Sequence, residues 1–109
     1  MSSNSNNSIE DIVNNLSPIE HAILYECGKM HISVNKNVNG DTLKKKLPDK
    51  YHKDFSKAIK NLLHKGLLVT YRPNNYGVPK KGRSVIDHIV KERQKDIYKG
   101  LRIMMVFDK

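Results

Sequence analysis

The chain has 109 residues, enough for one domain with a modest core, and 38% of its residues are hydrophobic. Its mean hydropathy is -0.62, and no run approaches the roughly 20 apolar residues that a membrane span needs. A single cysteine, Cys27, excludes an internal disulfide and a cysteine-based structural zinc site.

The positive charge is concentrated in the middle of the chain. Residues 41–83 hold twelve lysines and arginines against three aspartates, a net charge of +9, whereas residues 1–40 sum to -2 and residues 84–109 to +2. A localised basic region of this kind attracts polyanions such as nucleic acids. A solvated lysine face that serves only solubility is the alternative explanation.

The N-terminal region predicts a polar tail and then two helices. Residues 1–8 have neither a basic nor an apolar stretch, so we expect a disordered tail, no secretory signal and a cytoplasmic protein. A capping-box pattern that begins at Ser8 indicates a short helix. The run from Ser17 to Glu20 is a stronger start, because its serine can accept from the N3 amide, its proline fits the first helical position and its glutamate can reach back to the cap. We expect this second helix over residues 18–27, ended by Gly28.

The next segment predicts one strand, one turn and one short helix. Period-two alternation of apolar residues over 30–34 indicates a strand, and residues 35–40 are typical of a turn. Asp41 or Thr42 then caps a helix over residues 43–47, which a proline ends.

The most periodic segment of the chain predicts an amphipathic helix over residues 52–65. Its apolar residues recur at the spacing of one helix face, and they are Phe55, Ala58, Ile59, Leu62 and Leu63. Gly66 stands where a left-handed C-cap is expected.

A basic β-hairpin is predicted after this helix. Residues 67–72 are rich in β-branched and aromatic side chains and indicate a strand. Residues 73–77 form a tight loop and residues 78–80 a short return strand, in which Pro79 indicates a sheet edge.

A last helix is expected over residues 82–99, with Gly100 as its stop. The apolar residues 101–107 either extend this helix or form an edge strand. The stretch 85–107 has more apolar residues than one small domain covers, which favours a homodimer interface; alternatively, the tail folds back on the first helix. We therefore divide the chain into the tail, a domain over residues 9–100 and an apolar C-terminal tail over residues 101–109.

These elements define a mainly α fold with a small antiparallel β-hairpin, in the α+β class. The run from Phe55 to Val69, followed by the hairpin and by the run from Lys81 to Ile86, resembles the winged helix-turn-helix family in the broad MarR/PadR-like sense. In that family a recognition helix ends in Lys-Gly-Leu, a two-stranded wing follows, and a Lys-Gly-Arg-type turn opens the closing helix. The resemblance covers residues 17–90, although residues 78–80 replace the family's longer second wing strand. It implies an extended C-terminal helix and a homodimer on pseudo-palindromic DNA sites.

The polar face of the predicted 52–65 helix is a candidate reader of the DNA major groove. Lysine can meet phosphates or guanine acceptors there, and serine can bond either. The candidates are Lys53, Ser56, Lys57, Lys60, Asn61 and His64.

The hairpin and the preceding short helix supply the other candidate DNA contacts. Asparagines flanked by cationic groups can enter a minor groove or follow the phosphate backbone, although asparagine is also common in plain turns. The hairpin candidates are Arg72, Asn74, Asn75, Tyr76, Lys80, Lys81 and Arg83, and those on the short helix are Lys44 and Lys45.

The sequence thus predicts a sequence-specific double-stranded DNA-binding protein, a transcriptional regulator associated with the nucleoid. Two other classes stay open: a winged-helix module that docks on a partner protein of a transcription or replication assembly, and an RNA-binding winged helix. The five histidines show no metal-pair spacing and no catalytic pattern is present, so we expect no metal, no cofactor and no enzyme activity. The operator and any small-molecule effector are not encoded in these patterns.

Overall fold

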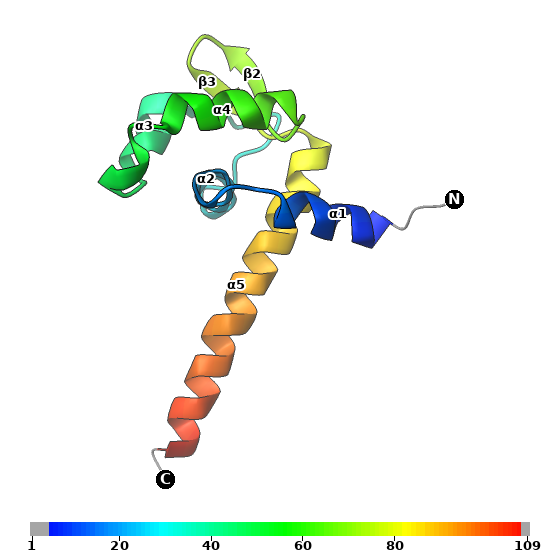
Figure 1. The fold of residues 1–109 in the computed structure, drawn as a ribbon, viewed down its shortest axis with the longest axis vertical. Helices are drawn as coiled ribbons and strands as arrows, with labels where there is room; N and C mark the ends of the chain where they lie inside the picture. Colours follow the sequence, from blue (N-terminus) through cyan, green and yellow to red (C-terminus); the bar gives the residue numbers. More distant parts are fainter. Residues whose placement is uncertain (1–4, 108–109) are drawn as a thin grey trace.

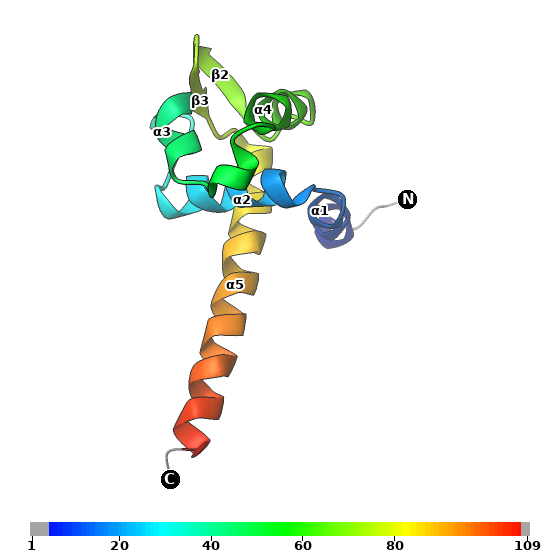
Figure 2. The ribbon, with the colours of Figure 1, turned by 60° about the vertical axis from the view of Figure 1, so that its left-hand side comes forward.

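The computed structural model describes the backbone of residues 5–107 and the side chains of residues 9–97. The fold is mainly helical with a small three-stranded antiparallel sheet (Figure 1). This confirms the predicted α+β class and adds one strand to the expected hairpin. Most elements gather in a head, and the long helix α5 projects from it (Figures 1 and 2).

The first two helices follow the predicted order, with one boundary moved. Helix α1 spans Ser5–Asn14, so it begins before the predicted Ser8 and takes in residues that we expected in the polar tail. Helix α2 spans Pro18–Lys29 and has the predicted capping box: Ser17 Oγ accepts from the Glu20 amide, and Glu20 Oε1 accepts from the Ser17 amide, both at 3.2 Å. This helix start is confirmed because its signal is entirely local.

The predicted end of α2 at Gly28 is wrong. Gly28 is the next-to-last residue of the helix, at the place where α5 packs against α2. A Cβ atom on Gly28 would lie 2.7 Å from Ile86 Cγ2 and 2.9 Å from Val90 Cγ2, so the absence of a side chain lets the two helices approach. The helix ends at Lys29 with Met30 as its C-cap, and His31 follows with a left-handed φ of 58°.

The predicted strand over residues 30–34 is absent, because that segment forms a turn and irregular chain. Strand β1 is Val38–Asn39, inside the segment predicted as a turn. It pairs with the hairpin, and Val38 lies opposite Tyr76. Helix α3 spans Gly40–Lys45, earlier than the predicted 43–47, because the Asn39 side chain caps it by accepting from the Asp41 amide at 2.8 Å.

Helix α4 spans Phe55–His64 and is the predicted amphipathic helix. It starts later than expected, because a short 3-10 helix over Asp49–Tyr51 and a turn occupy the residues before it. One face of α4 is buried in the core, through Phe55, Ala58, Ile59 and Leu62. Gly66 has a φ of 76° and confirms the predicted left-handed C-cap.

The hairpin is shifted relative to its prediction. Strand β2 spans Val69–Arg72 and strand β3 spans Asn75–Gly77, so the return strand lies within the segment predicted as a loop. Asn74, with a φ of 61°, makes the turn. Strand β3 is central in the order β1-β3-β2. Pro79 lies outside the sheet, so its lack of an N–H group does not interrupt the strand pairing.

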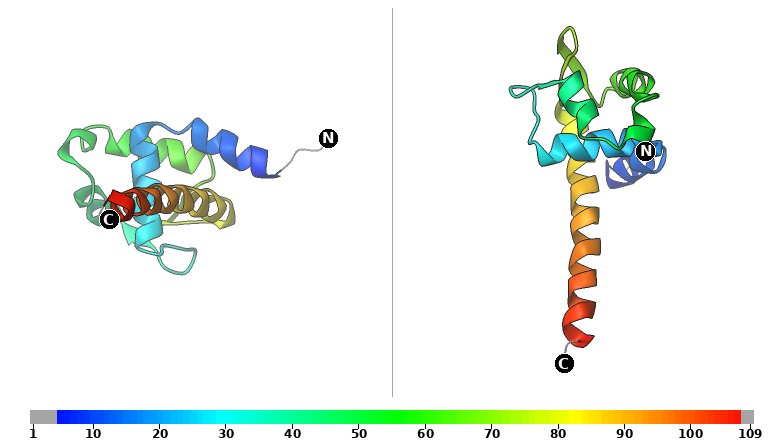
Figure 3. Two further views of the ribbon diagram at one scale, coloured as in Figure 1. Left: turned by 90° about the horizontal axis from the view of Figure 1, so that it is seen from below. Right: turned by 90° about the vertical axis from the view of Figure 1, so that its left-hand side faces the viewer.

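Helix α5 spans Lys80–Phe107 without a break, so Gly100 does not end it and residues 101–107 extend it. Its first turns lie in the head, where Val85, Ile86 and Ile89 are buried. From residue 91 to residue 97 every side chain is exposed, and the helix leads away from α4 and the hairpin (Figures 1 and 3). Nowhere in the described chain is a helix both long and apolar enough to cross a membrane.

One hydrophobic core holds the head together. The side chains without exposed surface include Leu24 of α2, Leu43 of α3, Leu62 of α4, Leu67 in the link between α4 and β2, and Val85 of α5. The core thus packs α4 against α2, and strand β1 joins the hairpin to the start of α3.

Candidate nucleic-acid interface

The exposed face of α4 and the turn just before it carry four of the predicted contact residues. Ser56, Lys57 and Lys60 lie on α4 and Lys53 lies in the preceding turn; we call these four residues the basic face of α4, and all four are exposed. Among the described residues, the lysines found in ion pairs are Lys29, Lys65 and Lys95, and none belongs to this face. The ammonium groups of the basic face therefore point to solvent without a carboxylate partner within the described chain.

Asn61 is directed toward α2 and not toward this face. Its side-chain Nδ2 donates to Glu20 Oε2 at 3.1 Å. Lys65 Nζ donates to Glu20 Oε1 at 2.7 Å, and the Glu20 side chain is almost completely buried. The three residues join the start of α2 to the end of α4, so they fix the orientation in which α4 presents its basic face.

This cluster predicts a pH-dependent loss of stability. Burial by itself raises the pKa of Glu20, but hydrogen bonds from Lys65, the Ser17 amide and Asn61 outweigh it, and the net pKa is lowered. The stabilisation is complete above the ordinary carboxyl pKa of about 4.3 and disappears as the pH falls through the lower folded-state pKa. Glu20→Gln keeps a capping side chain but removes the charge, and we expect it to cost about 2 kcal/mol at pH 7. Urea unfolding at pH 7 and pH 3 tests this, and an equal loss at both values would contradict it.

His64 and Lys81 lie together at the end of α4. They line a cavity of about 370 Å³ next to Ile12 and Asn15 of the α1 region. Lys81 Nζ donates to the Lys65 carbonyl oxygen at 3.0 Å, a favourable position for a cation because helix C-termini carry partial negative charge. The structure therefore uses Lys81 to hold α5 against α4.

The hairpin exposes an aromatic and cationic pair on strand β2. All four residues of β2 are exposed, and 57% of the Tyr71 surface is accessible. The Arg72 guanidinium carbon lies 5.1 Å from the centre of the Tyr71 ring, within cation–π range. Tyr71 sits at a break in the β2–β3 register, between Thr70 and Arg72. Sequence reasoning selected Arg72 but missed Tyr71, because the exposure of β2 follows from its place at the edge of the sheet, which only the tertiary arrangement shows.

The turn of the hairpin is docked on the start of α3. The Asn74 carbonyl accepts from the Gly40 amide at 2.8 Å, and the Asn74 side chain lies where a Cβ on Gly40 would be. Asn75 donates to the Pro73 carbonyl at 3.4 Å, and Tyr76 is half-buried against the core. These three predicted contact residues hold the hairpin in place, and Asn74 is the one that stays exposed.

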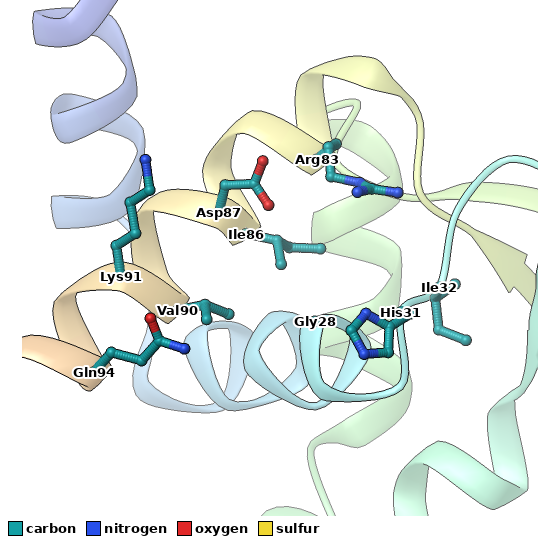
Figure 4. Close-up of a pocket in the computed structure, with 9 residues that line it drawn as sticks. All are labelled: Gly28, His31, Ile32, Arg83, Ile86, Asp87, Val90, Lys91 and Gln94. Atoms are coloured by element: carbon teal, nitrogen blue, oxygen red, sulfur yellow. The ribbon is translucent and has the colours of Figure 1, made fainter. Parts of the chain in front are cut away.

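The remaining predicted residues are dispersed. Lys45, near the end of α3, and Lys80, at the start of α5, are exposed, whereas Lys44 is half-buried. Arg83 lies away from the hairpin, on the rim of a cavity of about 270 Å³ between the end of α2 and α5, and Asp87 lies on the same rim (Figure 4).

The structure thus brings two parts of the predicted site to one end of the head. The basic face of α4 and the Tyr71–Arg72 pair both lie on elements at the end of the molecule farthest from the C-terminal part of α5 (Figures 1 and 2). The other predicted residues have different places in the head: Asn61 bonds to Glu20 of α2, Lys81 bonds to the end of α4, and Arg83 lines the cavity between α2 and α5.

Cys27 is buried in the core of the head. Burial, with a smaller effect of Glu26, raises the pKa of the Cys27 thiol to about 12, so the thiol stays protonated and packs as a small apolar group. No group of three histidine, cysteine, aspartate or glutamate side chains among the described residues is placed to hold a metal ion.

Comparison of the chain with models of known protein families, with curated proteins and with solved structures gave no match. The functional assignment therefore depends on the geometry of the basic face of α4 and the hairpin.

Proposed function

We propose that this chain is a winged-helix protein that binds double-stranded DNA in a sequence-specific manner and regulates transcription. In this proposal α4 is the recognition helix and the β2–β3 hairpin is the wing. The element order supports it, since the three helices α2, α3 and α4 are followed by a hairpin and a closing helix, and β1 joins the hairpin as a third strand. The Lys-Gly-Leu sequence at the end of α4 agrees with the same arrangement.

One observation carries the proposal: the two faces of α4 differ completely in character. The inner face is anchored in the core, whereas the outer face presents Lys57 and Lys60, and the preceding turn presents Lys53, without carboxylate partners among the described residues. A helix fits the width of the major groove of B-DNA, and cations held along one line of a fixed helix match the spacing of a phosphate-lined groove. Ser56 lies on the same line and can bond a base edge or a phosphate.

The wing supplies a second contact in the same proposal. Arg72 and Tyr71 project from an edge strand, and the turn beyond them is fixed to α3 through Asn74. A fixed wing costs less ordering on binding than a flexible loop. Arginine beside an apolar ring is suited to a narrow minor groove, where guanidinium groups meet strong negative potential.

Selection of bound sequences from a random duplex library tests the proposed function. We expect an enriched motif, and affinity for it that falls about a thousandfold between 50 and 200 mM salt if some six phosphates are neutralised. A structured RNA of equal length should compete poorly. Binding without any enriched sequence would reduce the function to non-specific attraction, and preferential binding of the RNA would replace DNA by RNA as the ligand.

We also propose that the chain acts as a homodimer through α5. The interface that we predicted over residues 85–107 must begin later in the helix, because Val85, Ile86 and Ile89 are buried in the core of the head. The exposed part begins at residue 91, and 61% of the Ile97 surface is accessible. A helical extension of this length is marginal in water without tertiary contacts, so a partner helix would stabilise it. Because α5 leads away from α4, a two-fold axis along α5 would present both recognition helices to the same duplex.

The dimer proposal predicts that Ile97→Asp yields a monomer. Two isoleucines would leave the interface, and the dimer dissociation constant should rise at least about 100-fold, or about 3 kcal/mol. Lys95→Asp is the control, because it introduces the same carboxylate about 200° around the helix. Light scattering at tens of micromolar gives the mass. A wild-type monomer, or equal masses for both variants, would contradict the proposal.

A further inference from the structure

A second surface feature lies on the side of α2 that faces away from the core. It is a groove of about 460 Å³ between α2, the connection from α3 to α4, and α5. We call it the α2 groove. In Figure 1 the hairpin lies above α3 and α4, and α2 lies below them, so we expect duplex DNA on the basic face of α4 to leave the α2 groove accessible. Its wall contains Pro18, His21, Ala22, Tyr25, Glu26, Lys29, Leu47, Pro48, Tyr51 and Arg93.

Aromatic rings and cations alternate along this groove. The Tyr25 ring has two cations near it, one from α5 and one from its own helix: the Arg93 guanidinium carbon is 4.2 Å from the ring centre, and Lys29 Nζ is 5.1 Å from it. The second tyrosine, Tyr51, has Lys50 Nζ at 5.2 Å from its ring centre. Both rings are half-buried, so each presents a partly accessible apolar surface inside a cationic rim.

The charge of the groove is unbalanced. Glu26 is the one carboxylate in its wall, and Lys29 pairs with it at 3.2 Å. Arg93 takes part in none of the ion pairs of the described chain, although it is fully charged at neutral pH. His21 does not offset this, because burial first and Arg93 second lower its pKa and favour its neutral form.

We propose that the α2 groove docks an acidic segment of a partner protein. A carboxylate of the segment would pair with Arg93, and one apolar or aromatic side chain would lie between Tyr25 and Tyr51. Charge complementarity selects this occupant. The proposal does not depend on DNA binding.

The probe for the test is a fluorescein-labelled peptide of twelve residues, all aspartate or glutamate except a phenylalanine and a leucine four positions apart. We expect saturable binding to the full chain by fluorescence anisotropy, with no displacement by duplex DNA. Arg93→Glu and Tyr25→Ala should each weaken binding at least about tenfold. Lys95→Glu makes the same charge change on the same helix outside the groove and should leave binding within about twofold. Since Arg93 is exposed, its variant tests the proposal even if Tyr25→Ala fails to fold.

Several results would overturn the proposal. One is absence of saturable binding by the full chain. Another is equal binding of a peptide whose phenylalanine and leucine are replaced by serine, since this would show charge attraction without a groove. Loss of binding in the Lys57→Ala, Lys60→Ala double variant would place the peptide on α4. If the peptide bound to the Ile97→Asp chain but not to the wild-type chain, this would show that a second copy covers the groove.

Discussion

Lys57→Ala combined with Lys60→Ala is expected to weaken binding of the selected duplex about 100-fold while leaving the fold intact. Each lysine is exposed on the basic face of α4 and lies outside its buried stripe. A hydrogen bond between an ammonium group and a phosphate contributes about 1.5 kcal/mol or more, so two such contacts correspond to about two orders of magnitude in affinity. Fluorescence anisotropy with a labelled duplex measures the change. The slope of log affinity against log salt should also decrease by about 2, because two phosphates lose their partners.

The control for this prediction is Lys91→Ala combined with Lys95→Ala. It removes the same charge from exposed positions on α5, beyond the head. If binding depends on the position of the cations and not on net charge alone, the control should lose at most about threefold in affinity. Equal weakening by both double variants would show that DNA is attracted by the total charge, and α4 would no longer be the reader.

Gly82→Ala is expected to destabilise the head by about 3 kcal/mol, or a fall of about 15 °C in Tm. Gly82 lies in the first turn of α5 and is buried against the link between α4 and β2. A Cβ atom there would meet the carbonyl oxygen of Leu67 and lie 3.0 Å from its carbonyl carbon and 3.1 Å from Val78 Cγ1. Backbone atoms cannot turn aside as a flexible side chain can, so α5 would have to move away from α4.

Ser84→Ala is the matched control for Gly82→Ala. It lies in the same turn of α5, is exposed, and makes only a 3.4 Å hydrogen bond to the Lys80 carbonyl. Alanine has the highest helix propensity, so both substitutions would be favourable by up to about 1 kcal/mol in an isolated helix. Thermal unfolding followed by circular dichroism should show a fall for Gly82→Ala and no fall for Ser84→Ala. An unchanged or raised Tm for Gly82→Ala would contradict the close packing of α5 on Leu67.

The elements that the sequence predicted well are those whose signals are local. The start of α2 follows from a capping box within four residues, and α4 follows from five apolar residues on one helix face and from the left-handed Gly66. In both cases the structure adds no distant contact that competes with the local preference. Their prediction therefore needed no knowledge of the tertiary arrangement.

The wrong boundaries arise where a distant contact decides. Gly28 resembles a helix stop in the sequence, but its lack of a side chain makes room for Ile86 and Val90 of α5, which are more than 50 positions further along the chain. Strand β1 has two residues and exists through its pairing with β3. In the hairpin, both Asn74 and Gly77 are residue types that favour turns, but the turn residue with a left-handed φ is Asn74. Gly77 lies in strand β3, where a Cβ atom would lie 2.9 Å from the Ser33 carbonyl oxygen.

The candidate site shows the same division between local and distant signals. The basic face of α4 could be predicted, because a helix with a known buried face has a known exposed face. The engagement of Asn61 with Glu20 could not, since these residues are 41 positions apart in the chain. Nothing in the sequence around Tyr71 marks its exposure, because strand residues of this type are as often buried.

Mapping the duplex contact by amide chemical shifts is the most direct test of the proposed recognition surface. A ¹⁵N-labelled chain would be titrated with the selected duplex at low salt. We expect the largest shifts and broadening at residues 53–60 and at Tyr71 and Arg72, with residues 91–97 unchanged. Shifts spread evenly over the basic residues, or centred on α5, would contradict the assignment of α4 as the recognition helix.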